Sequence, residues 1–141
     1  MPDIQHSIQI AAAPDAVHKL VSTARGFSRW WAEDVTEPDG VVELGFFNRN
    51  TIYRLRLKDN QPAEVEWICE SGEEWNGTHL LFRLEPRGNS TVLRFTHADW
   101  RSPSDYFTNC NTTWGELMFR LKAAAEGKSN GPLFLSNSMA Y

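Results

Sequence analysis

The chain has 141 residues, of which 41% are hydrophobic and 23% are charged, a composition typical of one globular domain with a substantial core. Its formal net charge is −4 with acidic and basic residues interleaved, so no basic face favours a nucleic-acid partner. The first residues lack the basic and apolar regions of a secretory signal, and no apolar run approaches the ~20 residues of a membrane span. We therefore expect a cytoplasmic protein.

An alternating strand is predicted near the N-terminus. Ile4, Ile8 and Ile10 alternate with polar residues, which is the pattern of a strand that buries one face. His6 shares the face of the isoleucines, so we expect its side chain to point inward.

Two short helical segments are expected next. Pro14 suits the first position of a helix, where its missing N–H costs nothing, and Gly26 should end that helix. The apolar stripe of this helix consists of Val17, Leu20, Val21 and Ala24. Residues 27–31 then predict a second helical turn that carries two tryptophans.

Five further strands follow, because apolar residues alternate with polar ones in each. The residues expected to face inward are Val42, Leu44 and Phe46; Tyr53, Leu55 and Leu57; Val65, Trp67 and Cys69; Leu80, Phe82 and Leu84; and Leu93, Phe95 and His97. Turns are predicted at 48–50, 59–62 and 86–89, and a polar loop at 71–77. Basic residues of the second of these strands face acidic residues of the third, which indicates that the two are antiparallel neighbours.

The last predicted element is a long amphipathic helix over about residues 103–126. Ser102 is expected to cap its N-terminus, with Pro103 at the first helical position, and Gly127 supplies a stop. Its apolar face consists of Phe107, Cys110, Trp114, Leu117, Leu121 and Ala124.

The order of these elements and several short motifs resemble the bacterial activator-of-Hsp90-ATPase-like family of the SRPBCC, or START/Bet v 1-like, superfamily. The motifs are Ile8-Gln9-Ile10 before Ala13-Pro14-Asp15-Ala16-Val17, then Trp30-Trp31, Gly77-Thr78 leading to Phe82-Arg83-Leu84-Glu85-Pro86, residues 91–97, Trp114-Gly115 and Leu121-Lys122. The resemblance covers about residues 3–132. It implies an α+β helix-grip fold, in which a curved antiparallel sheet wraps around the long C-terminal helix and two short helices follow the first strand. We expect a single helix-grip domain over residues 1–132 and a tail over 133–141.

Proteins of this superfamily mostly bind hydrophobic small molecules, so the resemblance implies a small hydrophobic or aromatic ligand in a cavity between sheet and helix. The residues expected to line that cavity are Phe46, Tyr53, Leu55, Trp67, Phe82, Phe95, His97, Phe107, Cys110, Trp114 and Met118. The tryptophans expected at the cavity mouth, or in contact with a partner, are Trp30, Trp31, Trp75 and Trp100. The same alternation is also typical of an ordinary core, and that alternative stays open.

Two further functions stay open on the sequence. One is a protein-interaction or chaperone-associated module of the Hsp90-activator kind, as a monomer or homodimer. The other is a cofactor-free lyase or cyclase that uses His97 or Tyr53. No spacing of catalytic residues is diagnostic, the glycines form no phosphate loop, and neither cysteine has a histidine nearby in sequence. We therefore expect no cofactor and no metal, and we favour a binding protein over an enzyme.

His6 and His97 form a separate hypothesis. Both fall on the inward faces of strands, the first and the last, which the implied fold places side by side. The two imidazoles are therefore expected either to be satisfied structural histidines or to anchor a ligand as a neighbouring pair.

Overall fold

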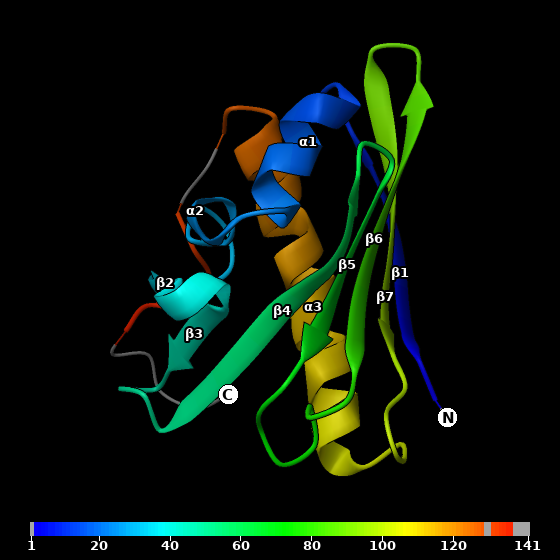
Figure 1. Cartoon of the computed structure of the whole chain (residues 1–141). Helices are drawn as coiled ribbons and strands as arrows, with labels where there is room; N and C mark the ends of the chain where they lie inside the picture. The colour runs from blue at the N-terminus through cyan, green and yellow to red at the C-terminus, as the bar shows by residue number, and fades with distance from the viewer. Residues whose placement is uncertain (1, 129–130, 137–141) are drawn as a thin grey trace.

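The computed structural model describes residues 2–128 and 131–136 of the chain. In chain order its elements are β1 (Ile4–Ile10), α1 (Pro14–Val21), α2 (Ala24–Phe27), β2 (Asp34–Thr36), the 3-10 turn η1 (Pro38–Gly40), β3 (Val42–Phe46), β4 (Thr51–Gln61), β5 (Glu64–Cys69), β6 (His79–Arg87), β7 (Ser90–Ala98) and α3 (Asp105–Ala125). The sheet curves around α3, and α1 lies at one end of the space between them (Figure 1). Within the described part, no helix is both long and apolar enough to cross a membrane.

The strands form one seven-stranded antiparallel sheet in the order β1-β7-β6-β5-β4-β3-β2. β1 pairs with β7 in a register that places Ile4 opposite His97, so the first and last strands are neighbours. This topology confirms the expected helix-grip fold. β2 and η1 were not predicted, because three residues are too few for an alternating pattern.

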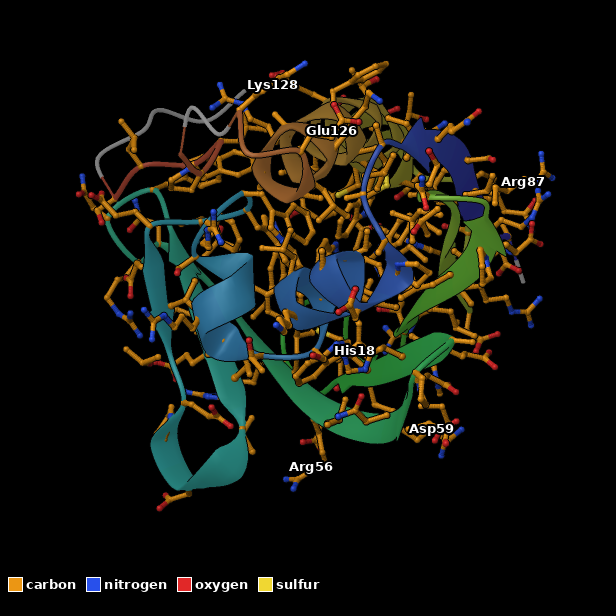
Figure 2. All side chains as sticks on the ribbon, turned by 90° about the horizontal axis from the view of Figure 1, so that it is seen from above. His18, Arg56, Asp59, Arg87, Glu126 and Lys128 are labelled. Carbon is orange, nitrogen blue, oxygen red and sulfur yellow. The ribbon has the colours of Figure 1, made fainter. Side chains whose placement is uncertain are left out.

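Ion pairs on the outer face of the sheet confirm the predicted pairing of β4 with β5. Arg56 Nε lies 2.7 Å from Glu70 Oε1, and Lys58 Nζ lies 3.5 Å from Glu66 Oε2. The side chain of Arg56 points away from the molecule in Figure 2. Exposed pairs of this kind contribute little to stability. They help to specify which strands are neighbours.

The β4–β5 hairpin differs from the prediction in two respects. β4 runs to Gln61, so the turn lies at residues 62–63 and not at 59–62. The register shifts between Leu57 and Asp59, and Leu57, predicted to face inward, is 37% exposed. Leu57 still pairs with Trp67, so the alternation holds as far as this residue. Its exposure shows that the inward face of the sheet is not fully covered at this point of β4. The β6–β7 turn is likewise shorter than predicted, because β6 continues to Arg87.

The two short helices also begin and end differently from the prediction. α1 ends at Val21, and Thr23 caps α2 by accepting a hydrogen bond from Gly26 N at 2.9 Å. Gly26 therefore lies inside α2 and does not stop α1. A Cβ at this position would collide with the carbonyl oxygen of Lys19, so glycine allows the close approach of the two helices.

Two indole groups satisfy the carbonyl groups at the end of α1. Trp30 Nε1 donates to Leu20 O and Trp67 Nε1 donates to Val21 O, each at 2.8 Å. These carbonyls have no partner within the helix, so the tryptophans fix the end of α1 against the core.

α3 begins two residues later than predicted. Its N-cap is Ser104, not Ser102, and the Ser104 hydroxyl accepts a hydrogen bond from Phe107 N. The buried face of α3 consists of Cys110, Trp114, Leu117, Met118, Leu121 and Ala124. Gly127 has a φ of 76°, which is the left-handed conformation that ends the helix as expected.

After α3 the chain returns across the molecule, and residues 133–136 lie beside the segment that follows α2. Leu133 N donates to Trp30 O at 3.1 Å, Phe134 N to Trp31 O at 3.0 Å, and Glu33 N to Phe134 O at 2.8 Å. Phe134 is thereby placed against the core. The other residues of the expected tail, 137–141, lie outside the described residues.

Candidate functional site

A small cavity lies between the sheet and α3. Its lining consists of Trp31, Phe46, Phe47, Thr51, Tyr53, Trp75, Tyr106, Cys110, Thr113, Trp114, Leu117 and Phe134. Eight of these twelve residues are aromatic and none is charged. Such a lining suits apolar and aromatic groups, because it offers large hydrophobic faces and no counter-ion.

The cavity is small because aromatic side chains of the protein itself fill the space between the layers. Its volume is about 30 Å³. A single water needs at least ~10–15 Å³ measured in this way, whereas small-molecule sites usually measure ~300–1,000 Å³. In this conformation the cavity has room for ordered water, and a larger molecule would have to displace a side chain.

Trp75 reaches into this space from the loop between β5 and β6. Its ring is stacked on that of Tyr53, with centroids 3.8 Å apart and an interplanar angle of 5°. It meets the His97 ring edge-on at 4.5 Å and lies nearly parallel to Trp114 at 6.1 Å. Trp75 is only 4% exposed, so a residue from a polar loop has become part of the core.

A second, open groove adjoins the cavity. It measures about 430 Å³ and is lined by Asn50, Thr51, Ile52, Tyr53, Gly72, Glu73, Glu74 and Tyr106. The two spaces share Thr51, Tyr53 and Tyr106, and the hydroxyl groups of the two tyrosines are hydrogen-bonded to each other. This tyrosine pair therefore separates the apolar cavity from a groove whose charged lining residues are both carboxylates.

His97 is held in one tautomer by a chain of hydrogen bonds. Trp114 Nε1 can only donate, so His97 Nδ1 accepts its hydrogen bond at 3.1 Å. The proton must then be on Nε2, which donates to Thr78 Oγ1 at 2.9 Å, and the Thr78 hydroxyl donates to Trp75 O at 2.6 Å. Burial lowers the pKa of His97 to about 3, so the ring is neutral at physiological pH. These hydrogen bonds connect α3, β7 and the loop of Trp75.

The expected pairing of His6 with His97 is not formed. His6 lies opposite Phe95 in the β1–β7 register, and its ring lies close to Gly115 of α3. Both ring nitrogens of His97 are already engaged by Trp114 and Thr78. His97 is therefore a satisfied structural histidine, as the first of the two expectations had it. His6 does not meet that expectation, because its Nε2 is buried without a hydrogen-bond partner among the described residues.

The predicted lining residues divide into two sets. Those that line the cavity are Phe46, Tyr53, Cys110 and Trp114. Those that lie elsewhere in the core or at its border are Leu55, Trp67, Phe82, Phe95, His97, Phe107 and Met118. Of the tryptophans predicted at the mouth, Trp31 and Trp75 line the cavity itself, whereas Trp30 and Trp100 are buried outside it.

Six lining residues were missed by the sequence reasoning: Phe47, Thr51, Tyr106, Thr113, Leu117 and Phe134. Tyr106, Thr113 and Leu117 recur at helical spacing with Cys110, so the periodicity of α3 contained a signal for them. Phe134 gave no such signal, because its position depends on the return of the chain after Gly127.

The Cys69 thiol is poorly placed for chemistry in the cavity, because it does not line it. The Cys69 thiol donates to Ser71 O at 3.2 Å, and burial raises its pKa to about 12, which keeps it protonated. In residues 2–128 and 131–136, no three His, Cys, Asp or Glu side chains are grouped to hold a metal ion.

Solved structures with the same architecture define the class of this protein. The Aha1 dimer from Colwellia psychrerythraea, solved in solution, is 28% identical, with a TM-score of 0.80 over 91% of this chain and 98% of that one. Protein MLL2253 from Mesorhizobium loti is 11% identical, with a TM-score of 0.76 over 91% and 99% of the two chains. A START superfamily protein from Mycobacterium smegmatis is 16% identical, with a TM-score of 0.63 over 89% and 95%. No protein-family model matches the chain, and no curated protein matches it.

The chain thus has the helix-grip fold of the START/Bet v 1-like proteins. Within that class, its fold is that of the Aha1-like proteins. The resemblance stated from the sequence motifs is confirmed at this level.

Proposed function

We propose that the protein binds a small hydrophobic or aromatic molecule in the cavity between the sheet and α3. The observation that supports this function is the uncharged and mostly aromatic lining, which lies next to an open groove. The driving force is removal of apolar ligand surface from water. Burial of ~200 Å² contributes about 5 kcal/mol before the entropy costs of binding.

Tyr53 and Tyr106 are the groups best placed to orient the ligand. Their hydroxyl groups lie where the apolar cavity meets the polar groove, so they can pair with a polar end of the ligand. His97, which the sequence suggested for this role, is not available, because both of its nitrogens are engaged inside the core.

A matched pair of variants tests cavity binding. Thr113 lines the cavity, and Thr112 is an exposed neighbour on α3 whose hydroxyl also donates to the carbonyl four residues earlier. Native mass spectrometry of the gently purified wild type should show a reproducible extra mass that disappears on denaturation. Thr113→Trp should fill the cavity and abolish that mass, whereas Thr112→Trp should retain it. Equal retention in both variants would contradict binding at this site.

A protein-interaction function is the second candidate, and two exposed apolar side chains favour it. Phe119 on α3 is 67% exposed and Leu135 is 48% exposed. The Colwellia neighbour is a dimer, so the partner could be a second copy of the chain. Analytical ultracentrifugation tests this: a wild-type dimer that Phe119→Ser converts to monomers supports the interaction, and a monomeric wild type at all concentrations contradicts the homodimer.

His97, the principal acid–base residue of the lyase or cyclase alternative, is not placed to act on a ligand in the cavity. His97 does not line the cavity, and its neutral ring has both nitrogens occupied. A general acid or base must be within hydrogen-bond reach of the proton that it moves. Only Tyr53, of the two residues first considered, borders the cavity.

A further inference from the structure

We propose that Trp75 occupies the ligand's own subsite, and that the ligand is a planar aromatic molecule of about the size of an indole ring that displaces it. This inference rests on the proposed function, and it adds the class of ligand and the route by which the ligand enters. Four observations support it.

The first observation is the set of rings around Trp75. Tyr53 lies parallel to it at 3.8 Å, His97 meets it edge-on at 4.5 Å, and Trp31 lies at 6.2 Å. Stacked and edge-to-face contacts on a flat group are the contacts by which a protein recognises a planar aromatic ligand. The subsite is therefore already shaped for such a ring, and the indole of Trp75 fills it.

The second observation is that the described hydrogen bonds of Trp75 all come from Thr78 in the same loop, whereas those of Trp31 and Trp114 reach other segments of the fold. Trp114 belongs to α3 and its Nε1 donates to His97. The backbone of Trp31 is bonded on both sides, because its N donates to Phe27 O and its O accepts from Phe134 N. Trp75 lies in a loop and is held through its carbonyl oxygen, which accepts hydrogen bonds from Thr78.

The third observation is an unsatisfied donor. In the described part of the chain, Trp75 Nε1 is buried without a hydrogen-bond partner, whereas Trp30, Trp67 and Trp114 all donate from Nε1. Trp100 Nε1 also lacks a partner there, but Trp100 does not line the cavity. A buried donor without a partner is costly, because it has lost its hydrogen bond to water. Movement of Trp75 into solvent restores that bond, which lowers the cost of opening.

The fourth observation concerns the two glycines that flank Trp75 in its loop and the groove beside that loop. Gly72 has a φ of 89° and Gly77 a φ of 88°, so the loop of Trp75 has a glycine on each side in a backbone conformation that other residues rarely adopt. The adjoining groove of about 430 Å³ is lined by Gly72, Glu73 and Glu74 of the same loop. When the indole of Trp75 leaves the cavity, it can move into this adjoining groove.

Binding is then an exchange in which the ligand replaces the contacts that Trp75 gives up. The apparent affinity of the wild type equals the intrinsic affinity multiplied by the fraction of molecules in which Trp75 has left the cavity. A variant without the indole should therefore bind more tightly. A flexible or saturated molecule would lose the stacking on Tyr53 and should compete poorly with the indole.

The experiment uses 2-naphthol as the planar probe and decahydro-2-naphthol as its saturated counterpart. Wild-type protein labelled with 5-fluorotryptophan is followed by ¹⁹F NMR, with the Trp75 resonance assigned from Trp75→Phe and its exposure measured by the solvent isotope shift. We expect 2-naphthol to expose Trp75 alone and to bind at least about tenfold more tightly than the saturated compound. Trp75→Ala should bind 2-naphthol about tenfold or more tighter than the wild type.

The controls separate this inference from the proposed function. Leu84→Ala empties a buried position outside the cavity, so it reports general loosening of the core and should leave the affinity for 2-naphthol unchanged. Binding of 2-naphthol while Trp75 stays buried in the wild type would overturn the displacement and leave cavity binding standing. The absence of binding to both the wild type and Trp75→Ala would overturn the displacement and the proposed function together.

Discussion

Acidification from pH 7 to pH 5 should destabilise this protein through protonation of His97 in the unfolded state. Its pKa is lowered to about 3 by burial in the folded state, whereas an exposed histidine in the unfolded chain has its ordinary pKa near ~6.5. Between these two values the unfolded state binds one proton that the folded state does not. The stability is therefore fully present above the unfolded pKa and is lost progressively as the pH falls toward the folded pKa.

The size of the effect follows from proton linkage. One extra proton on the unfolded state lowers the free energy of unfolding by ~1.36 kcal/mol per pH unit, which amounts to about 2 kcal/mol between pH 7 and pH 5. His97→Gln removes this titrating group while its amide can still donate and accept hydrogen bonds toward Trp114 and Thr78. We therefore expect the variant to be less stable at pH 7 but to lose about 2 kcal/mol less than the wild type on acidification.

Urea denaturation at intervals from pH 7 to pH 5, followed by tryptophan fluorescence, measures both free energies directly. The comparison isolates His97, because all other titrating groups are common to the two proteins. Parallel curves of unfolding free energy against pH would show that His97 takes up its proton equally in both states, and the reasoning from burial would be refuted.

Two further predictions concern the walls of the cavity, and denaturation measures both. Gly72→Ala should lower the free energy of unfolding by at least about 1 kcal/mol more than Gly88→Ala. Both glycines have a positive φ, so both variants have a strained backbone. A Cβ at position 72 would in addition lie 2.8 Å from a ring carbon of Tyr53, whereas a Cβ at position 88 has no neighbour within 4 Å. Equal losses would contradict the close approach to Tyr53. Phe134→Ala should cost about 2 kcal/mol, since a half-buried ring is removed, while Leu135→Ala at an exposed neighbour should stay within ~0.5 kcal/mol, and similar losses would show that the segment is not docked.

The strands and the long helix could be predicted because their signals are periodic. Residues such as Leu44, Leu55 and Phe95 are buried where alternation placed them. The ends of the elements were less certain, because Ser102 and Ser104 both precede a possible first turn and local sequence does not distinguish them. Leu57 has the face that alternation predicts and pairs with Trp67, yet it is 37% exposed, because alternation does not say how well that face is covered.

The cavity was harder to predict than the core, because alternation gives the face of the sheet on which a residue lies and not its position along the space between the sheet and α3. Phe46 and Phe82 both face inward, yet only Phe46 borders the cavity. Trp75 and Phe134 come from loops or from the C-terminal segment, whose paths depend on tertiary contacts. The hydrogen bonds that exclude His97 from the site are likewise formed by residues far apart in the sequence.

The pairing of Ile4 with His97 has a consequence for biosynthesis. β1 is made first, but eight other elements of secondary structure separate it from its partner β7, so this edge of the sheet cannot close before β7 has been synthesised. Contacts between such distant residues make folding slow, on the scale of about milliseconds to seconds, and leave apolar strands exposed in the meantime. Phe134, which completes the wall of the cavity, is synthesised later still. A nascent chain therefore has no cavity, and any ligand must enter after the whole fold has formed.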